Sequence, residues 1–126
     1  MSLNINIPEL SATIERELSA YSEEVAAHLK EDIKDAAQEM VNELRRTSPN
    51  DTGEYARGWA NRVEHESDED IRVVVYNKTR PSLTHLLENG HAKVNGKRTE
   101  ARPHIRPAAD RAGKRLEQKV KVSTKQ

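Results

Sequence analysis

The sequence predicts an α+β fold in which a long N-terminal amphipathic helix packs on a small antiparallel sheet, followed by a short helix and a C-terminal helix. Apolar residues recur in steps of three and four between Pro8 and Arg46, which is the spacing of one helix face. Residues 59–66 and 71–76 are predicted to be two strands joined by a polar turn, and the second of them is rich in β-branched side chains. A chain of 126 residues fits one domain, residues 1–126, that buries roughly two-thirds of its surface.

The segment 1–46 is predicted to form the long helix. Pro8 suits a first turn, and Arg45 and Arg46 lie near the negative end of the helix dipole. Unbroken, this helix would extend more than about 50 Å at ~1.5 Å per residue, so part of it would project from a compact domain or pack on a neighbour. The alternative is a break near Ser22, which would cap a second helix with two glutamates in its first turn.

Residues 47–58 are predicted to form a turn and a short helical turn. Pro49 pushes the residue before it out of the helical region, and the polar residues that follow favour a tight turn ending at Gly53. Asp51 or Thr52 is expected to cap the helical turn through its side-chain oxygen.

Residues 59–76 are predicted to form a β-hairpin. A lone hairpin is only marginally stable in water, so it must pack on the long helix or pair with further strands. We expect such strands to come from residues 91–100 or from another subunit.

Residues 80–90 are predicted to form a short helix that ends at Gly90. Residues 91–106 are expected to be a basic loop or strand that finishes in an extended Arg-Pro segment, because a residue before proline disfavours the helix. Pro107 then opens a C-terminal helix over residues 107–120. The basic side chains of the loop are Lys93, Lys97 and Arg98.

Charge is divided along the chain, although the formal net charge is zero. Residues 1–76 hold 17 acidic and 8 basic side chains, whereas residues 77–126 hold 4 acidic and 13 basic ones. Either the two parts neutralise each other within one subunit, or an acidic face meets a basic face of the next copy in a head-to-tail interface that closes into a ring. A third reading is that the basic part binds nucleic acid by displacing counterions from phosphates.

No local pattern predicts catalysis, a cofactor or a metal site. The absence of Cys excludes disulfides and thiolate sites. The spacing of His85, Glu88 and His91 differs from that of helix-borne zinc ligands, and a small hydrolase or nuclease built on them is the minority alternative. No apolar run approaches the ~20 residues that span a bilayer, and the start lacks a leader pattern, so we expect synthesis in a reducing cytoplasm.

Two short motifs carry a family resemblance. A Pro-x-Asp-Thr-Gly turn follows the first helix, and a Glu-x-Gly pair and an Ala-Arg-Pro run precede the last helix. The matching residues are Pro49, Asp51, Thr52, Gly53, Glu88, Gly90, Ala101, Arg102, Pro103, Ile105, Arg106, Pro107 and Ala108. In this order they resemble a family of tailed-bacteriophage minor tail components, which act in head-tail joining, the neck and tail completion. Tyr55 and His104 depart from the family pattern, which has an aliphatic residue and Phe there.

The resemblance implies a non-enzymatic structural protein of a tailed phage or prophage. Such a protein would be assembled in the bacterial cytoplasm and end in the neck or tail of the virion. Its expected partners are copies of itself, as a ring, and connector or tail-tube and terminator proteins. The alternative function is a small DNA-binding module that uses the basic C-terminal part.

Overall fold

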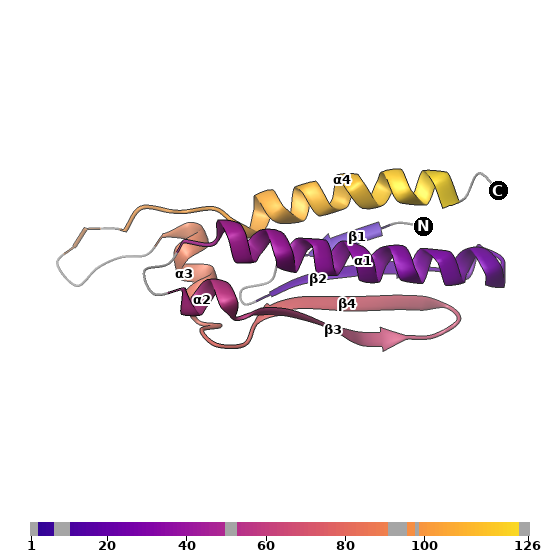
Figure 1. The fold of residues 1–126 in the computed structure, drawn as a ribbon, viewed down its shortest axis with the longest axis horizontal. Helices are drawn as coiled ribbons and strands as arrows, with labels where there is room; N and C mark the ends of the chain where they lie inside the picture. Colours follow the sequence, from indigo (N-terminus) through magenta and orange to yellow (C-terminus); the bar gives the residue numbers. More distant parts are fainter. Residues whose placement is uncertain (1–2, 7–10, 50–52, 91–95, 98, 124–126) are drawn as a thin grey trace.

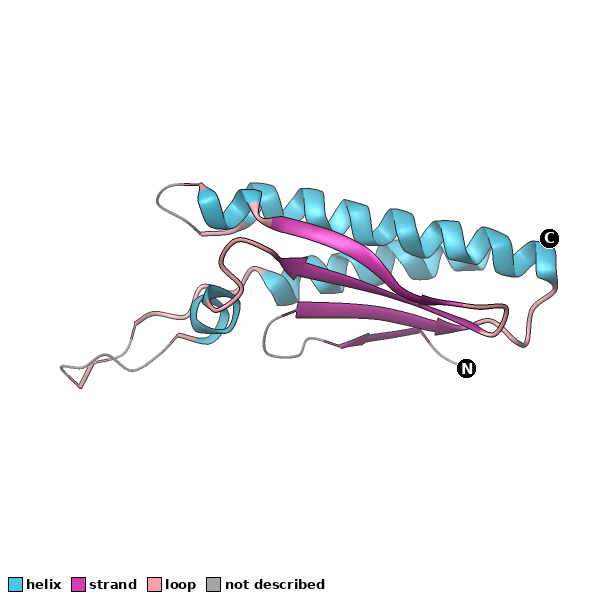
Figure 2. Cartoon of the chain, turned by 90° about the horizontal axis from the view of Figure 1, so that it is seen from below, coloured by secondary structure: helices cyan, strands magenta, loops and turns pink. Residues whose placement is uncertain are grey.

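The structure is a computed structural model that describes residues 3–6, 11–49, 53–90, 96–97 and 99–123. Its elements are β1 (Leu3–Asn6), β2 (Ser11–Glu17), α1 (Glu23–Thr47), α2 (Glu54–Arg57), β3 (Trp59–Glu66), β4 (Asp70–Asn77), α3 (Leu83–Asn89) and α4 (Ile105–Ser123). They form two layers, with α1 and α4 side by side over one face of the sheet (Figures 1 and 2). The predicted α+β class is therefore confirmed.

The sheet has four antiparallel strands in the order β1-β2-β4-β3. The hairpin expected from the sequence is β3–β4, in which Val63 lies opposite Val73. On the other side of β4, Ile14 of β2 also lies opposite Val73. The strands that complete the sheet thus come from the N-terminal segment. Of the segment 91–100, from which we expected a strand, residues 91–95 and 98 lie outside the described residues, and the others lie outside the sheet.

The helix expected over residues 1–46 is wrong in its first part, because β1 and β2 precede α1. Apolar residues four apart, such as Ile14 and Leu18, lie on one face of a helix, but four is also a multiple of two, so they lie on one face of a strand as well. Ile14 lies in β2 and Leu18 directly follows it; both are buried, and pairing with β4 satisfies the backbone of β2. The apolar spacing alone could not separate these two structures.

The helix α1 begins where the alternative reading had placed a break. Ser22 is its N-cap and accepts a hydrogen bond from the Val25 amide at 3.2 Å. Glu23 and Glu24 occupy the first turn, where the positive end of the dipole favours them. The position of the break is therefore confirmed, while the segment before it is a strand instead of a helix.

The core lies between the sheet and the two long helices and is mainly aliphatic. Trp59 is its largest side chain and is fully buried, and its indole N–H donates to Ser48 Oγ at 2.8 Å. This bond anchors the end of α1 to the start of β3. No helix in the described part of the chain is long and apolar enough to cross a membrane.

Opposite charges meet where α1 packs against α4, in a group that we call the charged seam. The seam consists of Glu39 and Glu43 on α1 and Arg111, Arg115 and Lys119 on α4. Lys119 Nζ lies 2.7 Å from Glu39, and Arg115 Nε lies 2.8 Å from the same carboxylate. Part of the charge division in the sequence is therefore neutralised within one subunit.

Candidate assembly site

The segment between α3 and α4, residues 90–103, is here called the arm. Its described residues 96–97 and 99–103 lie beyond the end of the sheet, on the side opposite the β3–β4 turn (Figures 1 and 2). The motif residues that the structure describes lie next to α2, within α4, or at the arm base, which is the name used here for Glu88, Gly90 and residues 102–106. The contacts at the base determine how the arm joins the body.

Glu88, at the end of α3, caps the N-terminus of α4 across the arm. One carboxylate oxygen accepts from the amides of His104 and Ile105, each at 2.8 Å, and the other accepts from the Arg106 amide at 2.9 Å. These are amides that a helix start leaves without intrahelical partners, and a carboxylate there also meets the positive end of the dipole. The Glu-x-Gly motif and the Arg-Pro motif are thus parts of one contact.

This cap explains why α4 begins earlier than expected. The sequence predicts extended backbone up to Pro107, whereas the helix starts at Ile105. Pro107 still lies in the first turn, where its missing N–H is not needed. The bonds to Glu88 stabilise the helical start that the proline disfavours at the residue before it.

Gly90 allows the two ends of the arm to approach each other. Its φ of +75° lies in the left-handed region, and an added Cβ would lie 2.6 Å from the Thr99 carbonyl oxygen. Nearby, the Arg102 amide donates to the Leu87 carbonyl at 2.7 Å. A side chain at position 90 would therefore force the returning chain away.

His104 is buried at the arm base, with only 3% of its surface exposed. Its Nδ1 lies 2.8 Å from the Arg102 carbonyl oxygen, so Nδ1 carries the proton and donates. Its Nε2 then accepts from the Tyr55 hydroxyl at 2.7 Å. Burial lowers the pKa of His104. The hydrogen bond to the Arg102 carbonyl and the nearby charge of Glu88 act in the opposite direction but are outweighed.

The two residues that depart from the family pattern therefore pack on each other. The rings of Tyr55 and His104 meet edge to face with 5.6 Å between centroids, and Trp59 lies 5.6 Å from Tyr55 in the same manner. Burial, with the charge of Glu88 second, raises the pKa of Tyr55, so its hydroxyl stays protonated and donates. This aromatic cluster joins α2, β3 and the start of α4.

Asn77 is a structural residue of this region that the sequence analysis missed. Its side-chain amide donates to the Tyr55 carbonyl at 2.7 Å, and its side-chain oxygen accepts from the Arg80 amide at 2.8 Å. It is 2% exposed, at the end of β4. An Asn followed by Lys-Thr-Arg-Pro after a strand is typical of side-chain-stabilised turns, which is the signal that could have identified it.

The motif residues separate into buried and exposed groups. Ile105 is buried, Pro49 and Pro107 are half-buried, and Arg102, Pro103 and Arg106 are exposed. Gly53 has a φ of +84° and precedes α2. Asp51, Thr52, Lys93 and Arg98 lie outside the described residues, and Lys97 is exposed. The structure thus brings Glu88, Gly90 and the Arg-Pro run together, with Tyr55 as their link to α2.

Of the three residues in the catalytic alternative, the structure describes only the side chain of Glu88. Glu88 is engaged by three backbone amides, while His91 and the side chain of His85 lie outside the described part. The described residues hold no group of three His, Cys, Asp or Glu side chains that could bind a metal ion.

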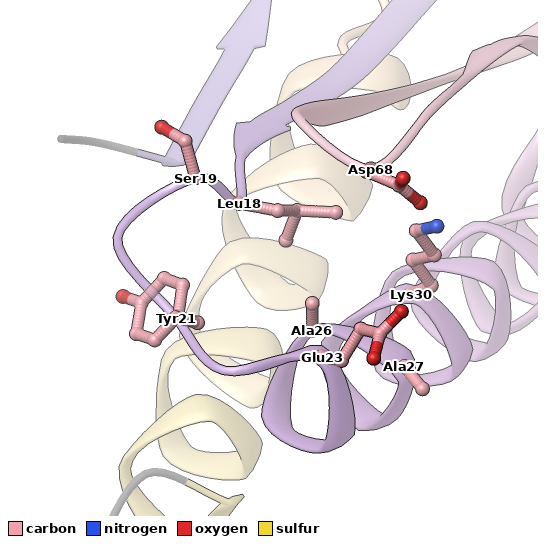
Figure 3. Close-up of a pocket in the computed structure, with 8 residues that line it drawn as sticks. All are labelled: Leu18, Ser19, Tyr21, Glu23, Ala26, Ala27, Lys30 and Asp68. Atoms are coloured by element: carbon pink, nitrogen blue, oxygen red, sulfur yellow. The ribbon is translucent and has the colours of Figure 1, made fainter.

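A pocket of about 350 Å³ lies at the far end from the arm, with Glu23, Lys30 and Asp68 in its lining (Figure 3). It includes none of the motif residues.

Comparison with known families gives one match. The family described as "Bacteriophage HK97-gp10, putative tail-component" matches residues 12–90, from β2 to the end of α3. The search of curated proteins and the search of solved structures found no significant match. The match includes Glu88 and Gly90 but ends before the Arg-Pro run, so the correspondence of that run stays a prediction. Because more than half of the chain is matched, the chain belongs to the HK97-gp10-like family of phage tail components.

Proposed function

We propose that this protein is a non-enzymatic structural subunit that acts in head-tail joining or tail completion of a tailed phage or prophage. It would self-assemble, as a ring, and dock to connector or tail-tube proteins in the neck or tail of the virion. The main support for the proposal is the arm base. There, contacts of Glu88, Gly90 and His104 fix the described ends of the arm to the body of the protein. A structural tail component acts through contacts with neighbouring proteins, and the described part of the arm offers exposed side chains for such a contact.

The exposed side chains at the arm base suit contact with another protein. Arg102 and Arg106 are exposed and have no carboxylate partner among the described residues. Exposed guanidinium groups are enriched in protein interfaces and suit carboxylates. The arm is therefore proposed as the docking element.

The experiment is charge reversal at the arm base. Arg102→Glu with Arg106→Glu should weaken assembly, while the circular dichroism of the monomer stays unchanged. Native mass is measured by size-exclusion chromatography with light scattering, at low and moderate salt. Lys114→Glu, which alters an exposed position of α4, is the control.

A second experiment tests the function in the phage. A phage that lacks its own copy of the gene is supplied with the Arg102 and Arg106 variant, and infectious particles are counted; full titres would contradict the proposal.

The alternative of a DNA-binding module has lost part of its support. Two of the basic side chains that it needs, Arg111 and Arg115, pair with carboxylates of α1 in the charged seam. The alternative predicts binding to duplex DNA that falls steeply with salt. Absence of binding at low salt removes it.

A further inference from the structure

Charge is divided in space differently from the way it is divided along the sequence. Ion pairs neutralise charge along the middle of the molecule, in the charged seam and across the sheet, where Arg72 pairs with Glu15 at 2.8 Å and Glu64 at 3.3 Å. Other ion pairs lie nearer the ends, such as the pair of Arg80 with Glu54 of α2 at 3.4 Å. Among the exposed charges without an ion pair in the described residues, one acidic group and one basic group lie at opposite ends of the long axis. Others lie outside these two groups: Asp35 on α1, Glu100 in the arm, and Asp110, Lys114 and Glu117 on α4. This arrangement was not visible in the sequence counts.

At one end, the exposed charged side chains without an ion-pair partner are all acidic. We call it the acidic end, and it is formed by the last residue of β2, the first turn of α1 and the β3–β4 turn (Figure 1). Its residues are Glu17, Glu23, Glu24, Asp68 and Glu69, all exposed. None of the five forms an ion pair with another described residue. Lys30, close to Asp68 and Glu23 in Figure 3, is paired with Glu66 at 3.8 Å.

The opposite end carries basic groups. We call it the basic end, and it consists of the end of α1, α2, the residue after β4 and the arm base (Figure 1). Its residues are Arg46, Arg57, Lys78, Arg102 and Arg106, all exposed and without a carboxylate partner among the described residues. Arg46 and Arg57 belong to the acidic part of the sequence. The fold, and not the order along the chain, therefore gathers these cations.

The two ends cannot meet within one molecule, because the two-layer body separates them (Figures 1 and 2). We propose that the acidic end of one copy receives the basic end and arm base of the next copy. Such a contact joins two different patches, so it is heterologous and generates a ring if the rotation closes. The inference rests on the proposed self-assembly and names the surface that receives the arm.

The contact should depend on salt and on charge sign. Exposed charges are screened over about 8 Å at physiological ionic strength, so moderate salt weakens the association. Reversing one end places like charges together and should weaken the association roughly tenfold or more. Reversing both ends restores opposite charges at the contact.

The test is a charge swap between copies. The acidic-end variant is Asp68→Lys with Glu69→Lys, in the β3–β4 turn, and the basic-end variant is Arg57→Glu with Lys78→Glu. Each variant alone should lose the assembled species in light scattering. A mixture of the two should regain it, because every contact then pairs one acidic with one basic surface, and so should the variant that carries all four changes. Lys114→Glu should assemble like wild type.

Specific results would overturn the inference. One is wild-type assembly by the acidic-end variant, and another is a mixture that stays monomeric although both variants are folded by circular dichroism. A wild-type chain that is monomeric at low salt and its highest soluble concentration would also overturn it. None of these outcomes decides whether the protein acts in the phage tail, because that role is tested by the infectivity of the Arg102 and Arg106 variant.

Discussion

Glu88 at the arm base and Glu43 in the charged seam are both buried carboxylates, but their partners differ. The Glu88 side chain is 11% exposed and binds three backbone amides. The Glu43 side chain is 7% exposed and binds Arg111 and Arg115, whose own side chains are 54% and 39% exposed. Backbone amides cannot move into water when their acceptor is lost, whereas long cationic side chains can. Burial alone therefore does not determine what a carboxylate contributes.

The largest expected effect is at Glu88. Glu88→Met keeps the volume but leaves the amides at the start of α4 without their acceptor, so the free energy of unfolding should fall by about 2–3 kcal/mol. Urea denaturation followed by circular dichroism measures this loss. Hydrogen exchange should show faster exchange of the His104, Ile105 and Arg106 amides. If Glu43→Met lowered the free energy of unfolding by the same amount, the proposed difference between the two carboxylates would be contradicted.

The next effect is at the hydrogen bond that joins the arm base to α2. Tyr55→Phe removes the hydroxyl and leaves His104 Nε2 buried without a donor, which should cost about 1 kcal/mol in urea denaturation. A Tyr76→Phe control changes a half-buried tyrosine on β4 and should cost less.

The same site should make stability depend on pH. Because burial lowers the pKa of His104 in the folded chain, the unfolded chain binds more protons there. Stability is therefore full above the ordinary histidine value of about 6.5 and falls as the pH drops below it toward the lower folded pKa. His104→Phe should remove this part of the pH dependence between pH 7.5 and 5. An unchanged slope would assign the dependence to other groups.

Glu43→Met sharpens the comparison with Glu88. The methionine fills the buried space, and the guanidinium groups of Arg111 and Arg115 can turn into water. Removing one partner of an ion pair is costly when the remaining charge stays buried, but these two guanidinium groups are already partly exposed, so the free energy of unfolding should change by less than about 1 kcal/mol. The measurement is the same urea titration, and a loss above that of Glu88→Met would reverse our ranking.

The smallest effect is expected at the exposed end of the charged seam. The hydrogen bond from Lys119 is the main cause that lowers the pKa of Glu39, so this pair contributes stability above the usual glutamate value of 4.5 and loses it as the pH falls through the lowered pKa. Both side chains are more than one-third exposed, so Lys119→Ala should cost no more than about 0.5 kcal/mol at pH 7. The difference should vanish in high salt or at pH 3.

Local signals in the sequence were sufficient for much of this fold. The β-branched run at residues 71–76 and the polar turn before it predicted the β3–β4 hairpin. Ser22 marked the start of α1 in one of the two alternatives, and Gly90 marked the end of α3. Each of these depends on neighbours within a few residues, through capping, backbone conformation or strand pairing across a short turn.

Tertiary structure alone decided the rest. The apolar spacing of residues 11–17 fits a helix or a strand, and pairing with β4, far along the chain, selected the strand. The motifs pointed to Glu88 and Arg106, but only the folded chain brings this carboxylate to the start of α4, and only folding places Tyr55 against His104. The separation of acidic and basic ends likewise follows from the way α1 packs against the β3–β4 hairpin, α2 and α4. Such contacts join residues distant in sequence, so composition, spacing and propensity cannot specify them.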